Sequence, residues 1–265
     1  MMRSFVHTPG PILRPYADHF FFNEGDRVDG RGTYFPALRG ELFFHFGDTF
    51  QVRVGGAETG APSWMSGLQA APMQVAIAGR HLSCGVLLKP WALYAAFGIP
   101  AGQSAGRLLP LPPPFDEMEA RLRRMTQGGA PGEILEAMEA CLLRAFRPAR
   151  VHGRVLEALM DEVPLPLHKG AVQEAAAQTG LRPKSYIEAF HRITGFTPGV
   201  YAQLQHVSAA VALLRNAPER SLTDIAYELG FYDQAHFIRC FRAFCGCTPG
   251  QFRRSRPDRF TGLAA

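Results

Sequence analysis

Residues 221–252 read SLTDIAYELGFYDQAHFIRCFRAFCGCTPGQF, and the fold of the C-terminal part depends on this stretch. Three phenylalanines recur at intervals of three and four residues: Phe237, Phe241 and Phe244. That spacing predicts a helix with one apolar face. Ser221 with Asp224 is close to a capping box and predicts the start of an earlier helix, and Gly230 allows a sharp backbone bend between the two. The stretch therefore predicts a helix-turn-helix unit.

The same unit occurs earlier in the chain. Two segments align at a constant offset of 51: YIEAFHRITGFTPGVY (186–201) and FIRCFRAFCGCTPGQF (237–252). Upstream of them, Ala175 matches Ala226, each a small residue that would let the second helix cross the first closely. The turn glycines, Gly180 and Gly230, are out of register by one residue, so the two turns need not be identical. Self-similarity at a fixed offset indicates one supersecondary unit used twice.

The second helix of each unit, about 183–193 and 233–244, is the predicted recognition helix, with its apolar face inward and its other face toward DNA. The DNA contacts predicted in the second unit are Tyr232, Asp233, Gln234, His236, Arg239 and Arg242. Those predicted in the first unit are Lys184, Ser185 and Arg192. Gln can pair in two ways with adenine, and Arg with guanine or phosphate.

Charge supports a nucleic-acid partner. The chain has 265 residues and a net charge of +5 at pH 7. Residues 1–165 contain 16 Lys and Arg against 16 Asp and Glu, whereas residues 166–265 contain 12 against 7. The whole positive excess therefore lies in the last hundred residues, as an anionic polymer would favour.

The N-terminal part has a different pattern. Residues 1–110 are short segments rich in aromatic and β-branched residues, divided by Gly and Pro, which predicts a β-rich sandwich or barrel. Residues 111–165 have helical periodicity and are expected to form a connector. The helix-turn-helix pair is expected over 166–256, with a tail at 257–265. The fold class is accordingly α+β, with a β-rich N-terminal domain and an all-α C-terminal domain.

The segment AYELGFYDQAHFIRCFRAFCGCTPGQFRR, residues 226–254, resembles the second helix-turn-helix motif of the AraC/XylS family of transcription regulators. The resemblance spans about residues 166–255. It implies that two motifs occupy successive major grooves on one DNA face and that a long helix, here residues 197–216, joins them. The first motif departs from the family, because Glu188 and His206 stand where Arg is common. We therefore expect a weaker or less selective first reader.

Residues 45–50 (HFGDTF) and 85–100 (GVLLKPWALYAAFGIP) also resemble, more faintly, a cupin-like sensor domain found in some members of that family. This resemblance implies a barrel that holds a small effector or mediates dimerisation. The candidate effector-binding residues are Phe44, Phe46, Trp64, Arg39 and Glu41. Most aromatic residues of this part are nevertheless expected to fill the barrel, since a barrel must be packed before it can hold a ligand.

Two rival functions remain open. A DNA-alkylation-repair methyl acceptor can carry the same tandem motif, but it needs a reactive cysteine cluster in the N-terminal part, where Cys84 stands alone. A cupin-type enzyme with an appended DNA-binding module needs clustered metal-binding His and Glu, and no His-x-His occurs. We therefore predict no catalytic residue, no metal site and no cofactor.

The prediction is a sequence-specific, DNA-binding transcription regulator in the cytoplasm. Its expected partners are double-stranded DNA, a small-molecule effector, a second copy of the chain as a homodimer, and RNA polymerase if it activates transcription. No membrane association is expected, because no apolar run approaches the length of a membrane span and no apolar signal core follows the N-terminus.

Overall fold

The computed structural model describes residues 2–54, 57–59, 62–148, 153–162 and 164–254; the expected tail at 257–265 lies outside them. The strands are β1 (Arg3–His7), β2 (Ala17–Gly25), β3 (Gly30–Tyr34), β4 (Gly40–His45), β5 (Thr49–Val54), β6 (Ala57–Thr59), β7 (Ser63–Ser66), β8 (Met73–Ala78), β9 (His81–Leu88) and β10 (Leu108–Leu109). The helices are α1 (Ala92–Phe97), the 3₁₀ turn η1 (Ala101–Gln103), α2 (Phe115–Met125), α3 (Pro131–Ala145), α4 (Arg154–Met160), α5 (Ala171–Gln178), α6 (Pro183–Thr194), α7 (Pro198–Asn216), α8 (Leu222–Glu228), α9 (Gln234–Cys245) and α10 (Pro249–Arg254).

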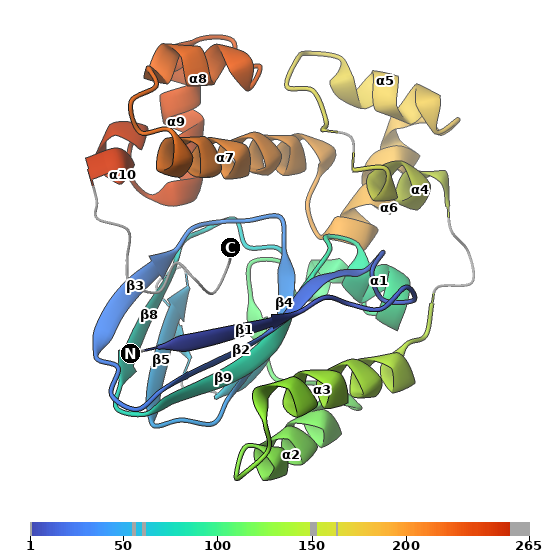
Figure 1. The fold of residues 1–265 in the computed structure, drawn as a ribbon. Helices are drawn as coiled ribbons and strands as arrows, with labels where there is room; N and C mark the ends of the chain where they lie inside the picture. The colour runs from blue at the N-terminus through green and yellow to red at the C-terminus, as the bar shows by residue number, and fades with distance from the viewer. Residues whose placement is uncertain (1, 55–56, 60–61, 149–152, 163, 255–265) are drawn as a thin grey trace.

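The strands form two antiparallel sheets in the N-terminal part, and helices form the C-terminal part (Figure 1). The larger sheet has the order β1-β2-β9-β4-β7-β10 and the smaller one the order β3-β8-β5-β6. The two sheets pack face to face, which confirms the predicted α+β class with a β-rich N-terminal domain and an all-α C-terminal domain. No helix in the described ranges is long and apolar enough to cross a membrane.

Aromatic rings fill the space between the sheets. Phe43 stacks on Trp64 with ring centroids 4.2 Å apart, and on Phe50 at 5.1 Å. The rest of this core is Phe21, Val52, Val75, Ile77 and Leu87. Gly85 of β9 allows the close packing, because a Cβ there would lie 2.4 Å from the ring of Phe21. Most aromatic residues of this domain are therefore packed in a core, as expected, but several of them, Phe20, Phe22 and Phe44, lie in the core shared with the helices rather than between the sheets.

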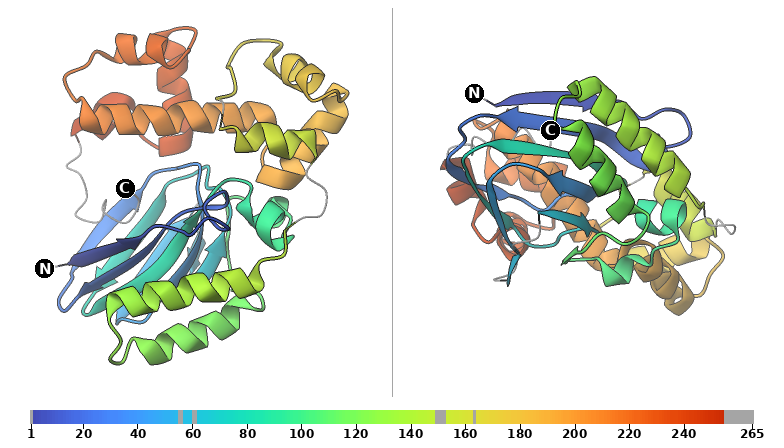
Figure 2. Two further views of the ribbon diagram at one scale, coloured as in Figure 1. Left: turned by 45° about the vertical axis from the view of Figure 1, so that its right-hand side comes forward. Right: turned by 90° about the horizontal axis from the view of Figure 1, so that it is seen from below.

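The other face of the six-stranded sheet is covered by helices. α3 packs across β1 and β2, and α2 packs on α3 (Figure 2). Glu139 of α3 ties these elements together, since its carboxylate lies 2.6 Å from His7 Nε2 and also accepts a hydrogen bond from Gly10 N. The apolar core on this side runs without a break into the C-terminal helices. The sheet and the helix-turn-helix units therefore share one core.

The three helices expected as one connector divide between two neighbours. α2 and α3 pack beside the sheets, whereas α4 packs on α6 through Val155, Leu156 and Leu159, which are all buried. α7 coincides with the predicted bridging helix: it begins at Pro198, and the side chain of Thr197 caps it by accepting a hydrogen bond from Val200 N. Its two ends carry the two helix-turn-helix units (Figure 1).

Two histidines are buried inside the β-rich domain. The rings of His45 and His81 lie 5.2 Å apart, and His81 Nε2 is 2.9 Å from Ser83 Oγ. His45 Nε2 and His81 Nδ1 are buried without a hydrogen-bond partner among the described residues. Burial lowers the pKa of His45 to about 4 and that of His81 to about 4, in the second case with a contribution from His45. Both rings are therefore neutral at pH 7.

Because His45 and His81 are buried as neutral rings, we expect the free energy of unfolding to fall in acid. An unfolded histidine has a pKa near 6.5, so the unfolded chain gains protons as pH falls from about 6.5 to 4 while the folded chain does not. Stability is full above pH 6.5 and falls by about 2–3 kcal/mol per ring toward pH 4. Urea unfolding of wild type and His45→Gln at pH 7 and pH 4.5 checks this. The variant should lose less stability than wild type, and equal losses would contradict the assignment.

Candidate nucleic-acid interface

The second helix-turn-helix unit is built by local hydrogen bonds. Ser221 caps α8 by accepting a hydrogen bond from Asp224 N at 3.0 Å. Gly230 holds a φ of +71°, a conformation that favours glycine, and lets Phe231 N donate to Ala226 O at 2.9 Å. Ala226 is fully buried where the two helices approach each other. The sequence prediction of a cap, a small residue and a turn glycine is confirmed for this unit.

α9 has an apolar inner face and a polar outer face. Phe237, Phe241 and Phe244 are buried. Gln234, Arg239 and Arg242 are exposed on one side of the helix, because positions 234, 238, 239 and 242 fall within about 140° of arc at 100° per residue. Tyr232, in the turn before α9, is 87 % exposed. These four polar side chains are placed as a recognition helix requires.

Two other predicted contacts of this unit have structural roles. The carboxylate of Asp233 caps α9 by accepting a hydrogen bond from His236 N at 2.6 Å. The imidazole of His236 is partly buried and packs edge-on against Phe231, with centroids 5.5 Å apart. Asp233 and His236 therefore shape the start of the recognition helix rather than extend from its exposed face.

Thr223 of α8 orients Gln234. Its hydroxyl donates to Gln234 Oε1 at 3.1 Å, and both side chains are exposed. A carbonyl oxygen has two lone pairs, so this bond leaves one acceptor site and the two amide hydrogens of Gln234 available to a base. Thr223 was missed in the sequence because the contact joins two helices, and nothing in the local pattern signals it.

The first unit repeats the turn, with one correction. Gly180 has a φ of +69° and Leu181 N donates to Ala176 O at 3.0 Å, the same bond that Phe231 makes to Ala226. Ala176 is fully buried, whereas Ala175 is only partly buried. The counterpart of Ala226 is therefore Ala176, and the sequence match to Ala175 was wrong. The reason is the turn: its second copy is one residue longer, so the offset is 50 before it and 51 after it.

The predicted contacts of α6 lie in two places. Lys184 and Ser185 are exposed in its first turn. Arg192, in its last turn, lines a groove together with Arg154 of α4 and Tyr94 of α1, and Arg154 Nη1 donates to Thr179 O at 3.4 Å. Arg192 therefore lies near α1 and α4, at the opposite end of α6 from Lys184.

The offset of 51 also identifies positions on α6 that match the arginines of α9. Glu188 corresponds to Arg239, and His191 corresponds to Arg242; both are exposed. His191 was missed as a candidate, although the repeat itself points to it. The first unit therefore presents a carboxyl group and an imidazole ring where the second presents two arginines.

The C-terminal end of α6 is fixed to the N-terminal domain. Gly195, with a φ of +81°, fits against Ala101 and Ala105, because a Cβ there would lie 2.4 Å from Ala105 Cβ. A Cβ on Gly102 of η1 would lie 3.3 Å from the ring of His191. The end of the first recognition helix therefore contacts the N-terminal domain directly, whereas α9 is held mainly by α7 and α8.

His206, which stands at a position where Arg was expected, has a local structural role. His206 Nε2 lies 2.9 Å from Leu165 O, and Gln205 Oε1 accepts a hydrogen bond from Leu165 N at 3.0 Å. The two side chains of α7 thereby hold the segment that enters α5. The ring of His206 therefore points toward Leu165 and holds the segment before α5 against α7.

The candidate effector residues separate into three environments. Arg39 and Glu41 line one cavity of about 440 Å³ at the mouth of the barrel. Trp64, which lies in the core between the sheets, donates a hydrogen bond from Nε1 to Glu41 Oε1 over 2.8 Å. Phe44 is buried in the core shared with the helices, and Phe46 packs there beneath the guanidinium of Arg123. The structure brings together Arg39, Glu41 and Trp64, but not the two phenylalanines.

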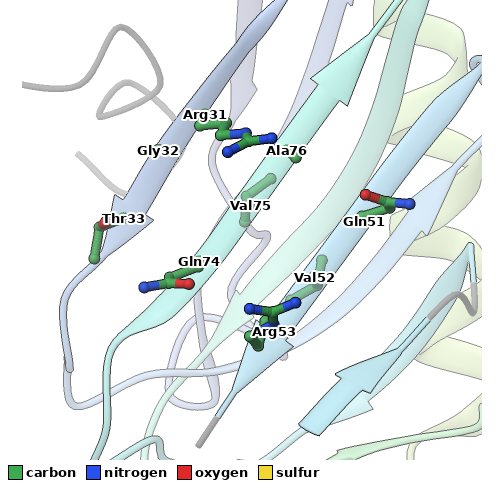
Figure 3. Close-up of a pocket in the computed structure, with 9 residues that line it drawn as sticks. All are labelled: Arg31, Gly32, Thr33, Gln51, Val52, Arg53, Gln74, Val75 and Ala76. Carbon is green, nitrogen blue, oxygen red and sulfur yellow. The ribbon is translucent and has the colours of Figure 1, made fainter. Parts of the chain in front are cut away.

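A second hollow, of about 460 Å³, lies on the outer face of the four-stranded sheet (Figure 3). Ala76 of β8 pairs with Arg31 on one side and Gln51 on the other, and the adjacent row places Gln74 beside Arg53. The long side chains rise around the small Ala76, which makes the surface concave. Residues of the N-terminal domain alone line it.

The cysteines do not form a reactive cluster. Cys84 is fully buried, and burial raises its pKa well above the ordinary value. Burial also raises the pKa of Cys240 to about 11. A thiol that stays protonated is a poor nucleophile, so Cys84 is unsuited to accept an alkyl group. Within the ranges described, no three His, Cys, Asp or Glu side chains are grouped to hold a metal ion.

Comparisons with known proteins agree with the geometry of the C-terminal part. A family described as a helix-turn-helix domain matches residues 175–255. The transcriptional activator RhaR of Klebsiella pneumoniae is 33 % identical over 147 residues, which are 51 % of this chain and 50 % of RhaR. The transcriptional regulator ExsA of Pseudomonas aeruginosa is 27 % identical over 92 residues, 35 % of this chain and 33 % of ExsA. The chain thus spans about half the length of RhaR and a third of that of ExsA.

Among solved structures, ToxT of Vibrio cholerae gives a TM-score of 0.46 at 9 % identity, over 96 % of this chain and 97 % of its own. That is a coarse resemblance only. The family match covers the segment in which the two turns and the two second helices are found. Residues 175–255 therefore form a tandem helix-turn-helix domain.

Proposed function

We propose that the chain is a sequence-specific DNA-binding transcription regulator. The observation that carries this proposal is the exposed face of α9, where Gln234, Arg239 and Arg242 stand together on a helix whose other side is fully packed. Phosphate contacts from Lys and Arg would position the protein, and this face would read base edges in the major groove. Relatives named as transcriptional regulators support the same assignment.

The two units would contribute unequally. α9 offers two arginines and an oriented glutamine, whereas α6 offers Lys184 and Ser185 in its first turn and Glu188 at the position of Arg239. A carboxylate facing phosphates or guanine is unfavourable. We therefore assign most of the sequence preference to the second unit. The packing of α4 on α6 leads us to begin the DNA-binding unit at α4 rather than at residue 166.

The N-terminal domain would act as the sensor. It contacts the end of α6 through Gly195 and lies against α10, where Phe35 and Phe252 pack edge to face at 4.8 Å. A ligand that favours one arrangement of these contacts can change DNA affinity only by its differential affinity for the arrangements. A protein that acts on DNA in this way would work in the cytoplasm, and its further partners would be a second copy of the chain and, if it activates transcription, RNA polymerase.

Selection of bound sequences from a random duplex pool at near-physiological salt tests the function. Preference that persists at this salt separates base reading from binding to the backbone alone. We expect enrichment of one strong half-site, read by α9, and a weaker one about 10 base pairs away. A pool that stays random, with and without candidate effectors, would reject the proposal.

A double substitution in α9 tests whether this helix reads the DNA sequence. Replacing Gln234 and Arg239 together by Ala should reduce the preference for the selected site over random DNA by about thirtyfold or more, since two base contacts of about 1–3 kcal/mol each are removed. Fluorescence anisotropy with both duplexes measures this. Arg121→Ala, which removes an exposed arginine of α2, is the matched control and should change neither affinity. An unchanged preference in the double variant would show that the wrong helix had been assigned.

A charge-removing substitution in α6 tests whether Glu188 faces DNA. Glu188→Gln removes a negative charge from the exposed face of that helix and should tighten binding about two- to fivefold, as expected for a charge pair of about 1 kcal/mol or less in water. The gain should shrink as salt increases. Glu136→Gln on α3 is the control, because it makes the same change on an exposed residue of the sensor half. If both variants behave alike, Glu188 does not face DNA.

A further inference from the structure

The cavity at the mouth of the barrel lies between the two halves of the protein. Its volume is about 440 Å³, within the range of small-molecule sites. Its lining comes almost entirely from the N-terminal domain, but Ser208 of α7 closes one side. Phe35 lies at its edge and also packs against Phe252 of α10. A molecule in this cavity would therefore contact the sensor and the helix that joins the two DNA-reading units.

The positive charges around the cavity are already neutralised. Arg39 forms an ion pair with Asp18. Lys89 Nζ lies 2.9 Å from Asp18 Oδ1 and 2.6 Å from Glu162 Oε1. Glu162 reaches this position with a φ of +56°, which residues other than glycine rarely adopt. These four side chains satisfy one another, so none of them requires a charged ligand.

Glu41 is the exception. Its carboxyl group lines the cavity and accepts a hydrogen bond from Trp64 Nε1, and it has no Lys, Arg or His ion-pair partner among the described residues. Burial raises the pKa of Glu41, and the bond from Trp64 only partly opposes this. A carboxylate held away from water without a cation is costly, and a ligand that supplies one would remove that cost.

Gln69, which also lines this cavity, carries a second unused acceptor. Gln69 Oε1 is buried and has no hydrogen-bond partner in the described part of the chain, while Gln69 Nε2 donates to Arg107 O at 3.2 Å. Both Gln69 and Glu41 therefore offer acceptors that the protein leaves unused. A complementary ligand must bring hydrogen-bond donors.

The remaining wall is apolar and aromatic. Its larger apolar and aromatic lining residues are Tyr34, Phe35, Leu38, Met73 and Leu87. Such a wall suits a compact hydrophobic or aromatic body, and aromatic rings also attract a nearby cation through their faces. His19 adds no charge at neutral pH, since burial lowers its pKa.

We propose that this cavity binds a small organic amine, with its ammonium group on Glu41 and Gln69 and its apolar body against the aromatic wall. Binding of the amine does not require DNA, but its role in regulation rests on the proposed function. A bound amine touches Ser208 of α7 as well as the barrel, so it stabilises the arrangement of sensor and DNA-binding domain in which both surfaces are present.

Three probes of nearly equal size test the class of ligand on the full chain. They are 2-phenylethylamine, 2-phenylethanol and 3-phenylpropionate, which share a ring and a short chain but carry a cation, a neutral hydroxyl and an anion. Titration calorimetry at pH 7.5 should show the amine binding at least tenfold more tightly than the alcohol. The carboxylate should bind most weakly, because it would face Glu41.

Glu41→Gln tests the site. The amide keeps the size of the side chain and can still accept the hydrogen bond from Trp64, so the variant should remain folded. Its affinity for the amine should fall at least tenfold while that for the alcohol stays the same. Glu136→Gln, the same change on the surface of α3, should leave all three affinities unchanged. Thermal unfolding of both variants without ligand verifies that they are folded.

The inference fails if the amine does not bind, if the carboxylate binds more tightly than the amine, or if Glu41→Gln leaves amine affinity intact. The duplex selection is read separately. A chain that selects a DNA sequence but ignores the amine keeps the proposed function and loses this site. A chain that binds the amine through Glu41 but selects no DNA keeps the site and loses the function.

Discussion

Each helix-turn-helix unit depends on one edge-to-face pair of aromatic rings. Phe190 of α6 packs on Tyr201 with centroids 5.1 Å apart, and Phe241 of α9 packs on Phe252 at 5.6 Å. The two pairs are related by the same offset of 51 residues. Such a pair contributes about 0.5–1.5 kcal/mol beyond the area it buries. Because the rings fix the inner face of the second helix, they also fix which side chains remain outside.

The same packing gives the two units different surroundings. α9 rests on α7, α8 and α10, so its outer face stays free, whereas α6 also contacts α1, α4 and η1. The end of α6 is therefore part of the boundary with the β-rich domain. Lys89 strengthens that boundary by bridging Asp18 of β2 and Glu162 after α4.

Local sequence patterns predicted the elements with good accuracy because the causes are local. Ser221 caps α8, and Gly230 turns the chain after α8 with a φ of +71°. The repeat predicted both turns, and periodicity predicted the buried face of α9. The match of Ala175 failed because a one-residue difference in turn length shifts the register, and sequence similarity does not show where a turn adds a residue.

The sequence by itself determined that there are two helix-turn-helix units, a β-rich domain before them, and a polar outer face on α9, since caps, turn glycines and helical spacing act over a few residues. Only the tertiary structure decided which polar residues are free. It assigned Asp233 and His236 to the start of α9, oriented Gln234 through Thr223, and placed Glu41 in a cavity where no described residue forms an ion pair with it. These outcomes depend on contacts between residues far apart in the chain, which no local pattern records.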